Sequence, residues 1–251
     1  MRAFLILLRK ELRSYFFSPM AYVLMSLFVF LAGWIFMFFV KAMNGQVVPK
    51  SLVFNLFTTP WFLIPAFFIF PLITMRLFAE ERKLGTIEGL FTAPIRTSAA
   101  VMAKYGAAVI LYAALIAPVF LFFPLFQKIT GQEAAFHGSA VWGAALVLLL
   151  VGMLNIAMGI FASSLTANQL IAAMLCFVGI VLHYFLGMLH YFVSMPGSGW
   201  TGLLTYFSID NHVRAFAEGL IDTRPIVYYL SSSAVLLALT HHVLEYRKWR
   251  A

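Results

Sequence analysis

Histidine is the residue type in this chain with the widest chemical repertoire, because an imidazole can bind a metal, carry a proton or form hydrogen bonds. His183 and His190 lie seven residues apart in one apolar run, and His212, His241 and His242 follow later. Seven residues are two helical turns, or roughly 10 Å along the axis. This spacing disfavours a shared metal, and buried histidines that form hydrogen bonds are the simpler interpretation. The alternative hypothesis is that these histidines hold a metal ion and that the chain is a metalloenzyme whose site lies inside a membrane.

A second concentration of polar residues lies between residues 76 and 104, in a chain that is only 10% charged. The charged residues of this segment are Arg76, Glu80, Glu81, Arg82, Lys83, Glu88, Arg96 and Lys104. So much charge between two apolar stretches indicates a loop at the membrane edge. Such a loop is where a membrane protein can meet a soluble partner.

The middle of this segment predicts a short amphipathic helix that begins after Gly85. Ile87, Leu90 and Phe91 follow at the spacing of one helical face. Pro94 disfavours helical geometry at the residue before it and should end the helix. Because two turns are too few for a stable isolated helix, we expect another surface to hold it. A solvated turn between two spans is the alternative.

The composition requires a membrane protein around these residues. Of the 251 residues, 63% are hydrophobic and 17% aromatic, whereas a soluble domain is about 45–50% apolar. No long alternating polar and apolar segments indicate a barrel, so helices are the expected spanning form. A spanning helix needs about 20 apolar residues, and six segments qualify: residues 22–40, 56–75, 105–126, 141–165, 170–192 and 226–244.

The predicted fold class is therefore all-α, a polytopic membrane protein with six transmembrane helices in one domain over residues 1–251. Four prolines inside the spans, at positions 65, 71, 118 and 124, predict kinks. Outside the spans we expect an interfacial helix at 1–18, the charged loop at 76–104 and an outer helical segment at 193–224.

The distribution of lysine and arginine predicts the orientation of this domain. Six spans place both termini on one face, which then carries twelve of the basic residues, against five on the other. Both termini are therefore expected in the cytoplasm, and the net charge of +8 is a topology signal. Nucleic-acid binding is not expected, because the chain has no soluble basic domain.

The first residues have the pattern of a helix that lies flat in the membrane interface. Arg2, Arg9 and Arg13 recur on one face, and Leu8 and Tyr15 lie on the other. The same helix could serve only as an anchor, or it could also contact a partner.

The segment before the last span predicts a further amphipathic helix. Ile209, Val213, Phe216 and Leu220 form an apolar face. We expect the helix to end near Gly219, because glycine readily adopts the left-handed conformation that often ends a helix.

The polar side of this helix repeats charges at four-residue intervals, at Asp210, Arg214 and Glu218. Exposed ion pairs of this kind contribute about 0.3–0.5 kcal/mol each. A helix on the outer face could dip into the membrane and gate a path, for which Asp210, His212, Arg214, Phe216 and Glu218 are the candidates. A lid that only closes the bundle is the alternative.

Two sets of motifs resemble a known family. Residues 80–90 read EERKLGTIEGL and residues 92–95 read TAPI, which is similar to the signature after the second span of type 2 ABC transporter permeases. The resemblance covers essentially the whole chain. The motifs FSIDNH at 207–212, FAEGLIDTR at 216–224, VYYLS at 227–231 and LEYRKWR at 244–250 most resemble the gliding-motility-associated subgroup.

The resemblance implies a permease subunit of the bacterial cytoplasmic membrane, with export as the expected direction. The short helix would be the coupling helix, which sits in a groove of a separate ATPase subunit. The contact residues it implies are Glu81, Gly85, Thr86, Ile87, Glu88, Leu90 and Phe91. The implied partners are two ATPase subunits, which would bind ATP and Mg²⁺, and a second permease in a homo- or heterodimer. No cofactor is expected in this chain.

The sequence lacks the motifs by which the chain could power transport itself, which agrees with an energy source in another subunit. The sequence has no G-x-x-x-x-G-K-[ST] loop, so it cannot bind ATP in the Walker manner. A proton-driven carrier places ionisable groups inside its spans, and these spans have few apart from histidines. A third hypothesis is a membrane scaffold that uses an ATPase for mechanical work or signalling. Such a scaffold would need the same coupling helix, so the motifs do not separate it from a transporter.

Overall fold

The computed structural model describes residues 2–43, 50–92, 95–131, 137–192 and 199–248, and within these ranges it is helical almost throughout, with no strand. The helices are α1 (Arg2–Phe16), α2 (Pro19–Met43), α3 (Leu52–Thr58), α4 (Pro60–Thr74), α5 (Ala79–Lys83), α6 (Thr86–Thr92), α7 (Thr97–Phe120), α8 (Phe122–Thr130), α9 (Gly138–Leu165), α10 (Gln169–Phe192), α11 (Gly199–Phe207), α12 (Ile209–Ala217) and α13 (Thr223–Lys248). Six stretches among them are long and apolar enough to cross a membrane, which confirms the fold class.

The bounds of the second and third spans differ from those expected. The second span was predicted to begin at residue 56, but α3 ends at Thr58 and α4 begins at Pro60. Thr59 between them is extended, with ψ of 135°, because a proline disfavours helix at the residue before it. The third span begins at Thr97, eight residues before the expected start, and its helix breaks at Leu121 after Pro118.

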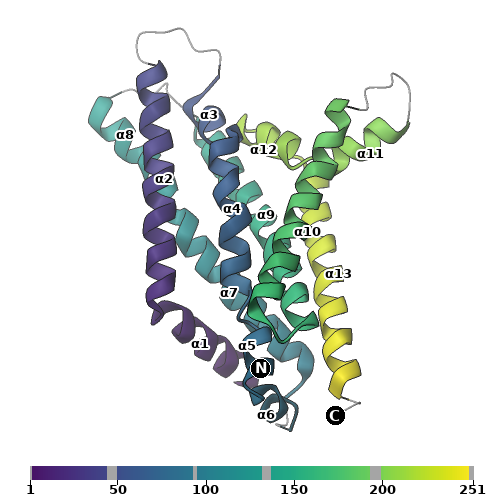
Figure 1. Cartoon of the computed structure of the whole chain (residues 1–251). Coiled ribbons are helices and arrows are strands. Elements are labelled where there is room, and N and C mark those ends of the chain that lie inside the picture. Colours follow the sequence, from purple (N-terminus) through teal and green to yellow (C-terminus); the bar gives the residue numbers. More distant parts are fainter. Residues whose placement is uncertain (1, 44–49, 93–94, 132–136, 193–198, 249–251) are drawn as a thin grey trace.

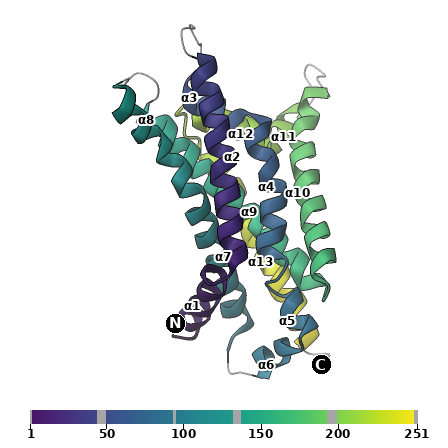
Figure 2. The same cartoon turned by 60° about the vertical axis from the view of Figure 1, so that its left-hand side comes forward.

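The bundle has two distinct ends (Figure 1). We call the end that carries α1, α5, α6 and the last turns of α13 the basal end, and the end that carries α3, α8, α11 and α12 the distal end. Figure 2 shows α6 beyond the ends of the spanning helices at the basal end. The helices α11 and α12 confirm that the segment before the last span is helical.

Helix α9 is the centre of the bundle and contacts α4, α7, α10, α12 and α13. Of its most apolar stretch 67% is buried, against 17% for α2 and 22% for α13. Its glycines let neighbouring helices approach closely. A Cβ at Gly152 would lie 2.0 Å from the ring of Tyr112, and one at Gly159 would lie 2.0 Å from the hydroxyl of Thr74.

We predict that Gly152→Ala destabilises the bundle by about 1–3 kcal/mol, the usual cost of inserting a methyl group into a packed core. The Tyr112 ring cannot swing away without loss, because its hydroxyl donates to the carbonyl of Leu148 at 3.0 Å. The check is the midpoint of thermal unfolding in detergent. Gly179→Ala is the matched control, because its nearest neighbour, the sulfur of Met158, would be 3.9 Å away. Equal midpoints for the two variants would contradict this packing.

Candidate functional site

The basal end carries the segment for which the sequence predicts a partner contact. Helix α5 ends at Lys83, Leu84 caps it, and Gly85 has a φ of 71°, which places it in the left-handed region that favours glycine. Helix α6 then runs from Thr86 to Thr92. The predicted interruption and the predicted two-turn helix are both confirmed.

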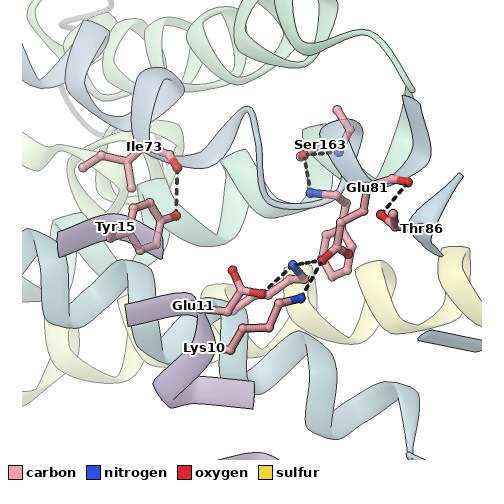
Figure 3. A network of polar contacts seen from close by, with 10 residues as sticks. Lys10, Glu11, Tyr15, Ile73, Glu81, Thr86 and Ser163 are labelled. Atoms are coloured by element: carbon pink, nitrogen blue, oxygen red, sulfur yellow. Dashed lines mark hydrogen bonds and ion pairs between the residues drawn. The ribbon is translucent and has the colours of Figure 1, made fainter. Parts of the chain in front are cut away.

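The start of this segment is fixed to α9 by one serine. The Ser163 hydroxyl accepts hydrogen bonds from the backbone N–H groups of Phe78 and Ala79, each at 3.0 Å, and donates to the carbonyl of Met75 at 3.2 Å (Figure 3). These backbone groups lie where α4 has ended and α5 begins, so Ser163 satisfies polar groups that the break leaves open. Ser163 is fully buried.

A cluster of four charged side chains ties the same segment to α1 and α7. The Lys104 ammonium lies 2.8 Å from the Glu81 carboxylate and 3.0 Å from that of Glu11, and Lys10 lies 3.9 Å from Glu81 (Figure 3). The side chain of Lys104 is only 5% exposed, and its ammonium lies 5.3 Å from the centre of the Phe78 ring. The two carboxylates balance the two ammonium groups, so the buried lysine is paired.

The sequence predicts that Lys104 belongs to the charged loop at the membrane edge, and this prediction is wrong. Helix α7 begins at Thr97, so Lys104 lies two turns inside it and faces the bundle. In the sequence, only an isolated lysine before an apolar run marks this position. Its two partners, Glu11 and Glu81, are 93 and 23 residues away. The periodicity of a sequence indicates which residues share a helix face, but it does not predict contacts between residues so far apart in the chain.

Two arginines bind the end of α9 next to Ser163. Arg82 of α5 donates to the carbonyl of Ser164 at 3.2 Å, and Arg247 of α13 donates to that of Leu165 at 2.9 Å. Both carbonyls belong to the last turn of α9, where a helix has unpaired acceptors and a partial negative charge. Helix α5 is thus joined to α1, α7 and α9.

The predicted contact residues divide into inward and outward groups. Glu81 is in the charged cluster, and the Thr86 hydroxyl donates to the Glu81 carbonyl at 3.2 Å. Ile87 is half-buried against the core, whereas Gly85 and Glu88 are exposed. The side chains of the other two, Leu90 and Phe91, lie outside what the structure describes.

The N-terminal helix uses its apolar face for the bundle. Helix α1 packs on α7, with Leu8 against Gly106. The Tyr15 hydroxyl donates to the carbonyl of Ile73 at 2.9 Å, and the burial of this hydroxyl raises its pKa. Arg9 and Arg13 are exposed.

At the distal end, α12 is docked on α9 and α3. Of the gate candidates, Phe216 is fully buried and His212 is 8% exposed. Arg214 binds Asp210 at 2.7 Å, which confirms the expected ion pair, whereas Glu218 binds Lys50.

The apolar face of α12 is shorter than predicted. Ile209, Val213 and Phe216 are buried, but Leu220 is 65% exposed. The helix ends at Ala217, and Gly219, with a φ of 84°, turns the chain away, so Leu220 is not on that face. The predicted glycine at the helix end is confirmed.

Two buried histidines form hydrogen bonds with tyrosines. His183 Nε2 lies 2.7 Å from the hydroxyl of Tyr228, and His212 Nδ1 lies 3.0 Å from that of Tyr229. The side chain of His190 lies outside the described part of the chain. Among the described residues, no three His, Cys, Asp or Glu side chains are placed to hold a metal ion.

Comparison with known protein families gives a match. A family model described as "ABC-2 family transporter protein" matches residues 12–183, which include α2 to α9 and most of α10. A comparison with curated proteins finds no match.

We predict that Lys104→Met destabilises the protein by about 3–5 kcal/mol, because it leaves two carboxylates without their buried counter-ion. Adding Glu11→Gln and Glu81→Gln should restore much of that stability. The measurement is thermal unfolding in detergent. Lys10→Met is the control, since its side chain is 67% exposed and its removal should cost no more than about 1 kcal/mol. A triple variant no more stable than Lys104→Met would refute the charge argument.

We predict a pH-dependent contribution of His212 to stability. Burial lowers the pKa of His212 to about 4, against 6.5 for an ordinary histidine, and Asp222 offsets part of that shift. The unfolded chain therefore takes up a proton between pH 6.5 and 4 that the folded chain does not, so stability falls as the pH is lowered through this window. In His212→Asn the loss of stability across the window should be shallower. His137→Asn, which replaces an exposed histidine, should keep the wild-type slope, and identical slopes in all three proteins would contradict the assignment.

Proposed function

The chain belongs to the ABC-2 family of transporter proteins, and on that premise we propose that it is a permease subunit driven by a separate ATPase subunit. The observation that carries the proposal is the basal segment from α5 to α6. Helix α5 is bound to three other helices, whereas α6 follows a glycine hinge and lies beyond the spans (Figure 2). A contact on α6 can therefore be transmitted to the bundle through α5.

The proposed energy source is ATP bound with Mg²⁺ by a pair of cytoplasmic ATPase subunits. The sequence has no Walker loop of its own. Closure of the ATPase pair would push on α6, and the connections of α5 would pass this movement to α1, α7 and α9. In this scheme Glu88, Leu90 and Phe91 contact the ATPase, Ile87 holds α6 against the bundle, and Glu81 transmits the movement through Lys104.

The proposed second partner is another permease subunit, either a copy of this chain or a related one. Helices α2 and α10 have only 17% and 28% of their apolar stretches buried within the chain. Their exposed residues include Trp34 at 70% and Phe185 at 60%. Such faces are suited to lipid or to another membrane subunit, and the translocation path would lie between the two permeases.

We propose that the basal end faces the cytoplasm of a bacterial cell and that the transporter works in export. Among the described residues, the basal end carries eleven of the lysines and arginines and the rest of the chain five, in agreement with the positive-inside rule. The resemblance of the motifs near the C-terminus supports a relation to the gliding-motility-associated permeases. At the distal end, α12 with its ion pair of Asp210 and Arg214 is the proposed gate.

The direct test is purification of the tagged chain from its native membranes in a mild detergent, with mass spectrometry of the proteins that co-elute. A Walker-motif ATPase at about equal stoichiometry supports the proposal. Reproducible elution without any ATPase would count against it.

We predict that Glu88→Arg lowers the recovery of the co-eluting ATPase by about tenfold, since a reversed charge at a complementary contact costs more than 1.4 kcal/mol. The measurement is the ratio of ATPase to permease by quantitative mass spectrometry. Glu245→Arg is the matched control, because it makes the same charge change at an exposed residue of the basal end that lies on α13. Equal losses in both variants would contradict a specific role of α6.

A further inference from the structure

A cleft of about 470 Å³ opens at the basal end between α1, the start of α2, the end of α4 and α5. This volume is within the range of small-molecule sites. None of the interactions that fix α5 to α9 occupies it, and the four residues of the charged cluster line part of it. It is therefore available to a ligand.

The walls of the cleft change from apolar to charged toward the basal end. Leu24 of α2 and Leu72 of α4 line the cleft and belong to the spans. Since α4 runs toward the basal end, Arg76, which follows the end of α4, and Glu80 of α5 lie nearer that end than Leu72, and both line the cleft. The hydrophobic part of the cleft thus lies deeper along the spans than the charged part.

The charged part carries groups of both signs that no described side chain binds. Arg76 is exposed and Glu80 is half-buried, and their side chains form no ion pair or hydrogen bond with other described residues. Lys10 from the opposite wall is 67% exposed and lies 3.9 Å from its nearest carboxylate, Glu81. With Glu11, Glu81 and Lys104, which also line the cleft, three cations and three carboxylates face a common space, and Arg76 and Glu80 are the two that no described side chain pairs.

This combination selects one kind of ligand. A guanidinium is the preferred partner of a phosphate group, and Lys10 can share that charge. A ligand with only negative charge would meet Glu80, and a simple cation would meet Arg76 and Lys10. A zwitterion with a phosphate and an ammonium group satisfies both, and the apolar wall at Leu24 and Leu72 suits acyl chains.

We propose that this cleft binds the headgroup of an aminophospholipid, with Arg76 and Lys10 on the phosphate and Glu80 on the ammonium group. The site would couple the position of α1 against α5 to the surrounding lipid. This inference does not depend on the identity of the ATPase or of the transported substrate.

The test uses the full-length chain, delipidated in detergent and exposed to equal amounts of phosphatidylethanolamine, phosphatidylcholine and phosphatidylglycerol. Native mass spectrometry measures the lipid that stays bound. We expect phosphatidylethanolamine to be retained by about tenfold over the other two, the effect of one charge-assisted hydrogen bond. Preferential retention of phosphatidylglycerol would overturn the proposal, because it would show only general attraction to anionic lipid.

Three variants separate the parts of the site. Arg76→Gln should weaken retention of phosphatidylethanolamine and phosphatidylcholine alike, whereas Glu80→Gln should remove only the preference between them. Ser14→Trp changes an exposed residue that lines the cleft and should block binding by filling it, with all charges kept. Lys83→Gln, on the exposed side of α5 and outside the cleft, is the control.

The unfolding midpoint of each variant shows whether it is folded. Unchanged retention in both Arg76→Gln and Ser14→Trp would overturn the site. The soluble headgroup, glycerophosphoethanolamine, should compete only weakly, because it lacks the chains that contact the apolar wall. Competition as strong as that of the intact lipid would show that the cleft does not bind a lipid.

Discussion

The basal end of this bundle depends on one buried ammonium group. Lys104 lies two turns inside a spanning helix, where an unpaired charge would be very costly. Its two carboxylate partners come from different parts of the chain, Glu11 on α1 and Glu81 on α5. Because the lysine cannot be left unpaired, the positions of α1 and α5 relative to α7 are fixed together. A movement of either helix must either carry α7 with it or separate an ion pair.

Helix α9 provides the fixed reference for these connections. It is the most buried of the spans and ends at the basal end beside α5. Ser163 satisfies three backbone groups at the break between α4 and α5, so the chain can leave its helix there without unpaired polar groups. Only beyond Gly85 does the segment lose these attachments. The basal end is therefore divided into a bound part, α5, and a projecting part, α6.

The distal end is held differently, by packing and hydrogen bonds between aromatic and histidine side chains. The carbonyl of Phe216 would lie 2.3 Å from a Cβ at Gly143, so α12 touches the backbone of α9. His212 binds Tyr229, Arg214 binds Asp210, and Glu218 at the end of α12 binds Lys50. A gate at this position would have to break these contacts to open. A gating movement of α12 would therefore cost the free energy of these contacts, whereas among the described residues the projecting α6 has no comparable set of contacts to break.

The sequence by itself determined the class of fold, the approximate spans, the two short amphipathic helices and the clustering of basic residues at one end. Hydrophobic length, helical spacing and the conformational limits of Gly85, Pro94 and Gly219 are local properties, and they can be read within a few turns of chain. Only the tertiary structure decided that Lys104 is buried, that Glu81 faces inward and that Ser163 anchors α5. Those outcomes depend on contacts between residues that are 23 to 93 positions apart. A polar residue near the end of a span has the same local pattern whether water, lipid or a distant carboxylate satisfies it, so its partner is fixed only when the helices pack.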